Sequence, residues 1–301
     1  QTNEVHLYIR EKQMTQPAVI QTDDFILAAE GVSMGPIAVR LARKPGEIEA
    51  CQRLRYDIFY KEYGAKPVGE MEKLGRDYDQ YDEHADHLIV IDRRIDTIPE
   101  RVVGTYRLIR NEAAAKVGQF YTASEFDIAP LIGQGQNMVE VGRSCVHPDY
   151  RTRSVLQLLW QGIAEYVTWH DIGILFGCAS FHGTDVPAHA NMLSYLHHFH
   201  RAPENFCPKA LPSQFVDMNM MAKEAINPKE ALHDLPPLIK GYLRIGGVIG
   251  DGAVIDEQFN TIDVCVIVKM KMVADRYRRH YERKVANFDG AVNPSVAAEI
   301  L

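Results

Sequence analysis

The segment 140–151, EVGRSCVHPDYR, constrains the fold more than any other, because it predicts a strand, a sharp turn and a helix in direct succession. Valine and cysteine residues favour an extended backbone up to Pro148, which cannot continue a helix or a central strand, so a strand is predicted near 138 to 147. Apolar residues then recur at helical spacing, which predicts a helix over 153 to 170. The strand carries one carboxylate and one guanidinium, and charges on a buried strand indicate a functional site.

The remaining elements alternate between strands and helices. Strands are predicted for 37–41, 88–91, 101–109, 173–178 and 261–269, and helices for 45–63, 187–200 and 229–243. This order predicts an α/β (α+β) fold with a mixed central sheet over residues 37–283. An N-terminal extension of residues 1–36 precedes that domain, and a flexible C-terminal tail of residues 284–301 follows it.

Composition excludes several classes of protein. Of the 301 residues 46% are apolar, enough for a sizeable core, and the formal charge of −7 argues against a nucleic-acid binder. The five cysteines form no CxxC pair and no secreted-type framework, so reduced thiols in a cytoplasm are expected. No apolar run is long enough to cross a bilayer, so the chain is predicted to be cytoplasmic, either soluble or peripheral on the inner membrane.

The turn after the predicted strand is basic. Arg151 and Arg153 flank the start of the helix that follows, where free backbone N–H groups and the helix dipole favour a phosphate. A strand, a basic turn and a helix therefore predict a site for a phosphate-bearing donor next to an acid. The alternative is that both arginines are ordinary surface charges.

Three upstream motifs resemble the acyl-homoserine-lactone synthases, which are GNAT-type acyltransferases that take acyl groups from acyl carrier protein. They are LRYDIFYKE at 54–62, DQYD at 79–82 and VGTYRL at 103–108. Later motifs resemble instead the ornithine-lipid branch of these enzymes, in which ornithine is N-acylated by a 3-hydroxyacyl carrier protein. They are FGCASFHGTD at 176–185, LPPLIKGYLR at 235–244, GDGA at 250–253 and FNTIDV at 259–264. The resemblance covers roughly residues 38 to 270.

The resemblance implies a GNAT-type acyltransferase fold: a mixed central sheet with helices on both faces and a bulged signature strand. Glu140 and Arg143 are three residues apart, which on a regular strand puts them on opposite faces. A β-bulge, for which Gly142 is the obvious place, would bring both to one pocket. In the resembling fold the amide freed by the bulge holds the thioester carbonyl. The alternative is a purely structural Glu–Arg pair.

The resemblance also implies direct acyl transfer. Glu140 is expected to act as general base on the α-amine of the acceptor, through a water, and Arg143 is expected beside it as the second catalytic residue. The acyl donor is expected to contact the signature strand and the basic turn at Gly142, Ser144, Cys145, Val146, Arg151, Arg153 and Ser154. The implied donor is an acyl-phosphopantetheine on acyl carrier protein, and no cofactor is expected.

The basic turn departs from the usual GNAT pattern, because Ser154 and Leu156 occupy the positions of its glycines. Without glycine the backbone cannot wrap the pyrophosphate of coenzyme A so closely. A carrier-protein phosphopantetheine has only one phosphodiester to hold, and an acidic carrier protein could dock on Arg151 and Arg153. The departure therefore favours a carrier protein over free acyl-coenzyme A.

The acceptor, ornithine, is expected to meet several charged residues. Arg55 falls inside the apolar stripe of its helix and is expected to pair with Asp79 or Asp82, unless it is a stripe-edge arginine that reaches solvent. Converging carboxylates suit a substrate with two ammonium groups, so Asp79 and Asp82 are the expected acidic pair, with a solvated acidic loop as the alternative. Arg107 is expected to hold the α-carboxylate of the acceptor or to balance the base. Asp263 is a further acceptor-binding residue and an alternative base.

Other chemistries have less support. The HHxH group at 197–200 spreads its rings around one helix, so no metal site is predicted. Cys145 and Cys178 lack histidine and aspartate partners at a suitable spacing, so no acyl-enzyme is expected. The glycines between 246 and 252 are expected to lie in turns.

The segment 276–284, RYRRHYERK, is basic with interleaved tyrosines and is expected to rest on an anionic membrane surface. A solvated helix and a dock for the carrier protein are the alternatives. Other functions also stay open: acylation of lysine, glutamine, glycine or tyrosine; an acyl-homoserine-lactone synthase, which would need an S-adenosylmethionine pocket; and a non-catalytic, membrane-active lipid-binding protein. The intact Glu140, Arg143 and Arg107 argue against the last.

Overall fold

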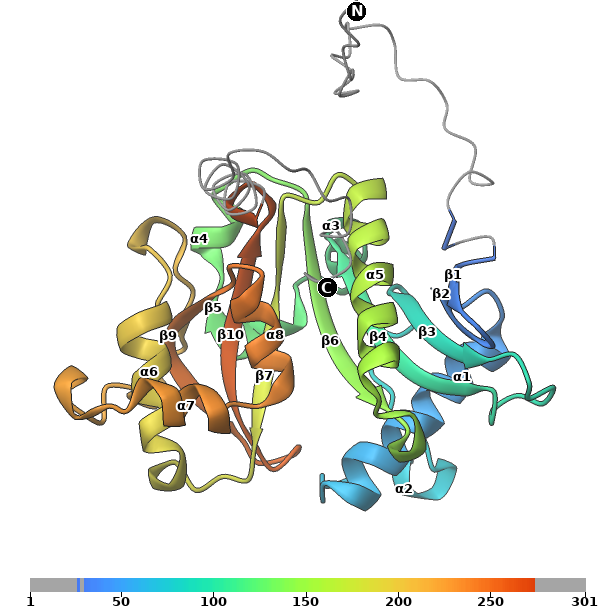
Figure 1. Cartoon of the computed structure of the whole chain (residues 1–301), viewed down its shortest axis with the longest axis horizontal. Helices are drawn as coiled ribbons and strands as arrows, with labels where there is room; N and C mark the ends of the chain where they lie inside the picture. Colours follow the sequence, from blue (N-terminus) through green and yellow to red (C-terminus); the bar gives the residue numbers. More distant parts are fainter. Residues whose placement is uncertain (1–25, 28–29, 274–301) are drawn as a thin grey trace, which may run out of the picture.

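Short apolar strands join into one large sheet in the computed structural model, which describes residues 26–27 and 30–273 (Figure 1). The sheet has the order β1-β2-β3-β4-β6-β7-β10-β9-β8-β5. In chain order the strands are β1 Val32–Met34, β2 Ile37–Leu41, β3 Asp86–Asp92, β4 Val102–Arg110, β5 Phe126–Asp127, β6 Met138–Val146, β7 Ile174–His182, β8 Lys209–Ala210, β9 Val248–Asp256 and β10 Thr261–Lys269.

Helices connect these strands. They are α1 Pro45–Tyr56, α2 Met71–Leu74, α3 Asn111–Val117, α4 Ala129–Ile132, α5 Arg153–Trp169, α6 Ala190–His200, α7 Pro228–Asp234 and α8 Pro237–Arg244. A π-helical segment, η2 Asp57–Glu62, prolongs α1, and a 3₁₀ turn, η3 Tyr121–Ser124, precedes β5. The predicted helix over 45–63 therefore contains a change of helix type near its end.

Helices cover both faces of the sheet, as predicted, and the alternation of side chains along a strand explains how. On β3, Leu88 and Val90 belong to the core cluster that contains the apolar residues of α5 and α8. Ile89 and Ile91 point to the other face and pack with α1. A Cβ on Gly162 would lie 3.0 Å from the Val39 side chain, so glycine lets α5 approach the sheet closely.

The two central strands β6 and β7 run parallel but pair only briefly. Their register joins Met138–Glu140 to Ile174–Phe176 and then stops. At the end of this pairing a Cβ on Gly177 would lie 2.2 Å from the carbonyl oxygen of Val141, so only glycine fits there. Beyond this contact the strands part, which leaves room between them in the middle of the sheet.

The predicted bulge in β6 is confirmed. In the ladder with β4, Thr105 faces Cys145 and Arg107 faces Gly142, so two residues of β6, Arg143 and Ser144, stand opposite the single residue 106. The left-handed residue is Arg143, with φ of 51°, and the unusual backbone falls one position after the glycine where we expected it. The extra residue turns Arg143 to the face of the sheet that Glu140 occupies.

Two predictions about the later part of the chain are wrong. Gly250 and Gly252 lie in β9 and not in a turn, and a Cβ on Gly250 would lie 2.8 Å from the carbonyl oxygen of Pro208. The predicted helix over 229–243 is two helices, because Pro236 and Pro237 cannot donate the hydrogen bonds that would continue α7 into α8.

The ends of the chain bear on three further predictions. Residues 32–34, placed by prediction in the N-terminal extension, form β1 and pair with β2, and Leu27 is fully buried. The predicted tail 284–301 and the basic segment 276–284 lie outside the described residues. Within the described part of the chain, none of the helices combines the length and the apolar character that a membrane span requires.

Candidate active site

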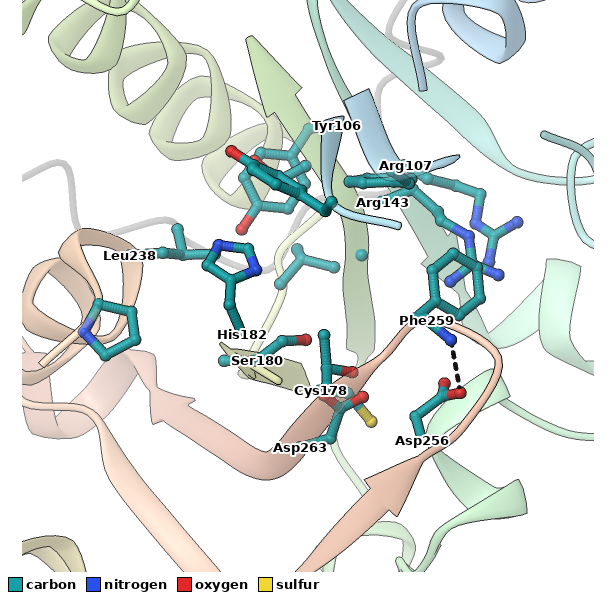
Figure 2. A pocket seen from close by; sticks show the side chains of 18 of the residues that line it. Tyr106, Arg107, Arg143, Cys178, Ser180, His182, Leu238, Asp256, Phe259 and Asp263 are labelled. Carbon is teal, nitrogen blue, oxygen red and sulfur yellow. Dashed lines mark hydrogen bonds between the residues drawn. The ribbon is translucent and has the colours of Figure 1, made fainter. Parts of the chain in front are cut away.

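A cavity of about 360 Å³ opens where β6 and β7 part (Figure 2). Its wall comes mainly from β4, β6, β7 and β10, and from the turn after β9. Figure 2 shows Arg107, Arg143 and Phe259 on one side, Cys178, Asp263 and Asp256 on a second side, and His182 and Leu238 on a third. One cavity therefore brings together cationic, acidic and apolar walls.

Glu140 lies on β6 at the wall of this cavity and is 2% exposed. Thr122 donates two hydrogen bonds of 2.8 Å to its Oε1 atom, one from the backbone N–H and one from the hydroxyl. The other oxygen, Oε2, is buried and has no hydrogen-bond partner among the described residues. Burial raises the pKa of Glu140 to about 7. One fixed oxygen, one free oxygen and a pKa near neutrality together suit a general base.

Arg143 lies on the same side of β6 because of the bulge. Its guanidinium carbon lies 4.2 Å from the ring centroid of Phe259 and 4.9 Å from that of Tyr121, so the side chain is held between two aromatic rings. Its ion pairs with Asp77 and Asp79 are long, both 3.4 Å, and its Nε has no hydrogen-bond partner among the described residues. The aspartates thus hold Arg143 only through long contacts, while its side chain lines the cavity where an anionic substrate group can approach.

Arg143 belongs to a set of three arginines and three aspartates, which we call the arginine–aspartate network. Its members are Arg55, Arg107, Arg143, Asp77, Asp79 and Asp82. Arg55 donates to both oxygens of Asp82 at 2.9 and 2.8 Å, and its Nε lies 2.7 Å from Asp77. Burial alone would raise the pKa of Asp82, but the attraction of Arg55 holds that pKa below its usual range.

The network shows where four predicted residues lie: Arg55, Arg107, Asp79 and Asp82. Arg55 pairs with Asp82 as expected and is fully buried, so it is not a stripe-edge arginine that reaches solvent. Asp77, its second partner, was not predicted. Asp79 accepts a 2.6 Å hydrogen bond from Arg107 instead. Neither Asp79 nor Asp82 lines the cavity, and both accept from arginines, so their predicted role in binding the ammonium groups of the acceptor finds no support in this geometry.

A second group of carboxyls forms no ion pair with an arginine among the described residues, and we call it the acidic wall: Glu125, Asp256 and Asp263, with the thiol of Cys178 among them. The ligand atoms of Glu125, Cys178 and Asp263 all lie within 4.8 Å of one another. The Cys178 thiol lies 3.3 Å from Glu125 Oε2 and donates to it. Burial, and then repulsion from Asp263, raises the pKa of Glu125 to about 8, and burial raises that of Asp263 to about 6.

Of the acidic wall, only Asp263 was predicted as a site residue. Glu125 sits in a short polar connection before β5, where no periodic pattern marks it as buried. Asp256 ends β9, a strand that the sequence did not reveal, and it accepts hydrogen bonds from the backbone of Gln258 and Phe259 at 2.8 and 2.9 Å. The contact between these residues depends on which strands are neighbours, and that order is not visible in the sequence.

The predicted donor-binding residues divide into two groups. Gly142, Ser144, Val146 and Arg151 line the cavity. Cys145, Arg153 and Ser154 do not: Cys145 packs with α1 on the sheet face, while Arg153 and Ser154 are exposed at the start of α5. Arg151 donates two 2.6 Å hydrogen bonds to Glu62 of η2, so part of its charge is already neutralised.

The third side of the cavity is apolar. Leu156 of α5 and the residues Pro236, Pro237 and Leu238 at the start of α8 form it. These three residues belong to the motif 235–244, to which the sequence alone assigned no role. Tyr106, on the strand opposite the bulge, also lines the cavity, and its hydroxyl hydrogen-bonds the hydroxyl of Tyr242 in α8. An apolar wall that begins beside the bulge suits an acyl chain.

The histidines of the HHxH group do not meet at a common point. His198 contacts the carbonyl oxygen of Met221 at 3.0 Å, and His200 contacts the hydroxyl of Tyr195 at 3.0 Å. Among the described residues, Glu125, Cys178 and Asp263 are the group of potential metal ligands that does converge. Cys178 hydrogen-bonds as a thiol, and burial raises its pKa well above the usual value, so it is not an activated nucleophile.

Comparison with known proteins agrees with this geometry. Residues 54–161 match the acetyltransferase (GNAT) domain family. The chain is 46% identical over 259 residues, 85% of its length and 92% of the relative, to L-ornithine N(alpha)-acyltransferase of Brucella abortus (strain 2308). It is 46% identical over 252 residues, 82% of its length and 95% of the relative, to the protein of the same name from Rhodobacter capsulatus.

Two solved structures show a more distant likeness to this chain. FeeM, an N-acyl amino acid synthase from uncultured soil microbes, is 12% identical, covers 77% of this chain and 91% of its own, and has a TM-score of 0.43. The acyl-homoserine-lactone synthase LasI is 12% identical, covers 77% and 89%, and has a TM-score of 0.39.

A bulged strand, a parallel neighbour that parts from it and a buried carboxyl between them define an acyltransferase of the GNAT class, in agreement with the matched domain. The long and close similarity to the curated relatives makes the assignment more specific. This chain belongs to the family of the L-ornithine N(alpha)-acyltransferases.

Proposed function

We propose that this protein transfers a 3-hydroxyacyl group from acyl carrier protein to the α-amine of ornithine and so makes lyso-ornithine lipid. The names of its relatives and their 46% identity over most of the chain support ornithine as the acceptor. The observation that carries the chemistry is the Oε2 atom of Glu140, which is buried, lacks a hydrogen-bond partner among the described residues and belongs to a cavity-lining side chain.

In the proposed reaction, Glu140 accepts a proton from the α-ammonium group of ornithine, directly or through a water. The free amine attacks the thioester carbonyl, a C–N bond forms, and the C–S bond breaks. The phosphopantetheine sulfur leaves as a thiolate, which needs little acid assistance because its reference pKa is about 8.5, and it then takes up the second proton that the nitrogen loses as the amide forms. Backbone N–H groups at the Arg143 bulge supply the donors toward which the carbonyl oxygen would point.

The carrier protein of the donor would bind at the protein surface, at the start of α5. Arg153 is exposed at the start of α5, whereas Arg151 is held by Glu62. Free N–H groups of the α5 terminus lie beside Arg153, with Thr152 as the cap that accepts from Val155 at 3.3 Å. One phosphodiester and an acidic protein surface fit this end of α5 better than a pyrophosphate does, because no glycine opens the turn.

A direct assay tests the acceptor and the donor together. The protein is incubated with equal amounts of a 3-hydroxyacyl carrier protein and the matching coenzyme A thioester, with a mixture of free amino acids, and products are identified by mass spectrometry. We expect acyl-ornithine as the main product and a preference of at least about tenfold in kcat/KM for the carrier thioester. Acyl-lysine, acyl-glutamine, acyl-glycine or acyl-tyrosine as the main product would replace ornithine as the acceptor.

Charge reversal on the surface tests whether the carrier protein binds at the start of α5. Arg153→Glu is expected to raise the KM for the carrier protein and to weaken the salt dependence of kcat/KM, because screening acts on exposed charges. Lys116→Glu is the matched control: it reverses an exposed charge on α3, which lies near the C-terminal end of α5, away from the start of that helix (Figure 1). Equal effects of the two variants would show that the carrier protein does not dock at α5.

A further inference from the structure

The acidic wall contains one buried polar atom that lacks a hydrogen-bond partner among the described residues. Asp263 is 5% exposed and lines the cavity, yet its Oδ1 atom has no hydrogen-bond partner among the described residues. A buried carboxylate oxygen without a partner costs free energy unless a ligand satisfies it. Cys178 also lines the cavity, with Glu125 next to it on the protein side. This wall therefore provides acceptors and negative charge for a ligand with N–H donors.

The cavity has opposite charges at its two sides. Arg107 and Arg143 line one side, and Asp256 and Asp263 line another (Figure 2). The Nε atom of Arg107 and the Oδ1 atom of Asp263 are buried without a hydrogen-bond partner among the described residues, so an unpaired donor lies on one side and an unpaired acceptor on the other. The base, Glu140, belongs to the same cavity. A zwitterionic amino acid with a cationic side chain has this charge order: carboxylate, reacting amine, distant ammonium.

A series of contacts joins the base to the acidic wall. Thr122 donates from its hydroxyl to Glu140 at 2.8 Å, and the Cys178 thiol lies 3.6 Å from that hydroxyl and 3.3 Å from Glu125. The acidic wall is thus the neighbour of the base on the side of β7 and β10. The two nitrogens of ornithine are separated by roughly 6 Å when the chain is extended, from standard bond lengths. Glu140 and Asp263 line the same cavity, so we infer that a short diamine chain reaches both.

From this geometry we propose that the acidic wall is the specificity site of the enzyme: Asp263 and Asp256, with Glu125 behind them, bind the side-chain ammonium of the acceptor. This inference rests on the proposed function and adds the residues that distinguish a diamino acid from a neutral amino acid. Arg107 and Arg143 hold the carboxylate of the acceptor at the other side. Asp79 and Asp82, which the sequence suggested for the ammonium, serve the arginines instead.

Because the carboxyls of the acidic wall titrate, binding of the side-chain ammonium should depend on pH. Glu125 faces Cys178, Asp263, Asp256 and Arg143, and its pKa is raised to about 8, first by burial. The pKa of Asp263 is raised to about 6. As pH rises from about 6 to 8 these carboxyls lose protons, so the wall becomes more negative and attracts an ammonium more strongly. The KM for ornithine should fall over this range, while an acceptor without a side-chain amine should show no such fall.

Norvaline is the acceptor that tests the site, because it has the carbon chain of ornithine and lacks the side-chain amine. The wild-type protein is expected to prefer ornithine by at least about 100-fold in kcat/KM, because norvaline leaves the buried acceptors unpaired. Asp263→Asn is expected to lower kcat/KM for ornithine by about 10- to 100-fold and to change that for norvaline by less than about threefold. The matched control is Glu257→Gln, which removes one charge from the exposed turn beside Asp256 without touching the cavity.

Three results would overturn the inference. Equal loss for both acceptors in Asp263→Asn would make Asp263 a general structural residue. Equal use of ornithine and norvaline by the wild-type protein would remove the specificity site and leave acyl transfer standing. Loss of activity with EDTA that zinc restores would assign Glu125, Cys178 and Asp263 to a metal. A protein that acylates no amino acid at all would instead refute the proposed function, so the two failures are distinguishable.

Discussion

The arginine–aspartate network and the acidic wall lie near the same cavity but differ in how their charges are paired. In the network three arginines meet three aspartates, with contacts as short as 2.6 Å, and Arg55 is fully buried. In the acidic wall, carboxyls stand close together, and the pKa values of Glu125 and Asp263 are raised by burial. Paired charges satisfy each other and fix structure, whereas unpaired buried charges reduce stability and await a ligand.

Glu140 shares features of both regions, because one oxygen is paired and the other is not. We predict that Glu140→Gln lowers kcat by roughly 10²- to 10⁴-fold, the usual contribution of a general base. The amide can still accept the hydrogen bonds of Thr122, so the melting temperature should not fall. In the wild-type protein kcat/KM should rise with pH through about 7, because Glu140 can accept a proton only after losing its own.

Thermal melting, acyl-donor affinity and the pH–rate profile are measured on the same Glu140→Gln sample. A rate that falls together with the melting temperature and the donor affinity would place Glu140 with the structural charges. Near wild-type turnover in a stable protein would exclude Glu140 as the base, and Asp263 would become the next candidate.

The network predicts a large effect on stability instead. Arg55→Met removes the cation closest to Asp77 and Asp82, so two buried carboxylates keep only longer contacts with Arg143 and Arg107. The expected loss in the free energy of unfolding is about 3–5 kcal/mol, as for other broken buried ion pairs. Urea unfolding measures it as a lower midpoint. Arg53→Met on the same helix is the control, because its pair with Glu49 is exposed and should contribute below about 1 kcal/mol.

A second substitution makes this test sharper. Adding Asp82→Asn to Arg55→Met removes one of the stranded charges and should recover part of the lost stability. If the double variant is less stable than Arg55→Met alone, Asp82 is held mainly by Arg107 and by backbone, and Arg55 is not the centre of the network.

Much of the framework is predictable from sequence because local chemistry determines it. Pro148 ends β6, apolar spacing marks α5, and β10 falls at the predicted residues. The bulge also follows from local reasoning. Glu140 and Arg143 are three residues apart, so their side chains can share a pocket only if the strand contains one extra residue between them. The position of the left-handed residue does not follow, because glycine suggested 142 and the ladder with β4 puts it at Arg143.

The acidic wall is the part that sequence could not reveal. Glu125, Cys178 and Asp263 are far apart in the chain, and they meet only because β10 inserts between β7 and β9. The strand β9 was hidden by Gly250 and Gly252, which normally weaken a strand but here allow close contact with neighbouring backbone and with Phe215. The pairing of charges in the network could not be predicted either. Asp77, Asp79 and Asp82 lie close together in the sequence, and only the fold determines which arginine each of them contacts.

The smallest expected effect concerns the stability cost of the acidic wall. The pKa of Glu125 rises from about 4.5 in the unfolded chain to about 8 in the fold, so between these values the folded protein keeps a proton that the unfolded chain has released. Stability therefore falls as pH rises through this window. Glu125→Gln removes this dependence and should raise the melting temperature at pH 8.5 by roughly 2–4 °C, the shift that about 1 kcal/mol produces in a domain of this size, with a smaller difference near pH 5. The exposed Glu72→Gln on α2 is the control and should show no pH-dependent gain. A melting temperature that falls at pH 8.5 would mean that Glu125 is ionised and well paired, and the contrast between the two regions would no longer hold.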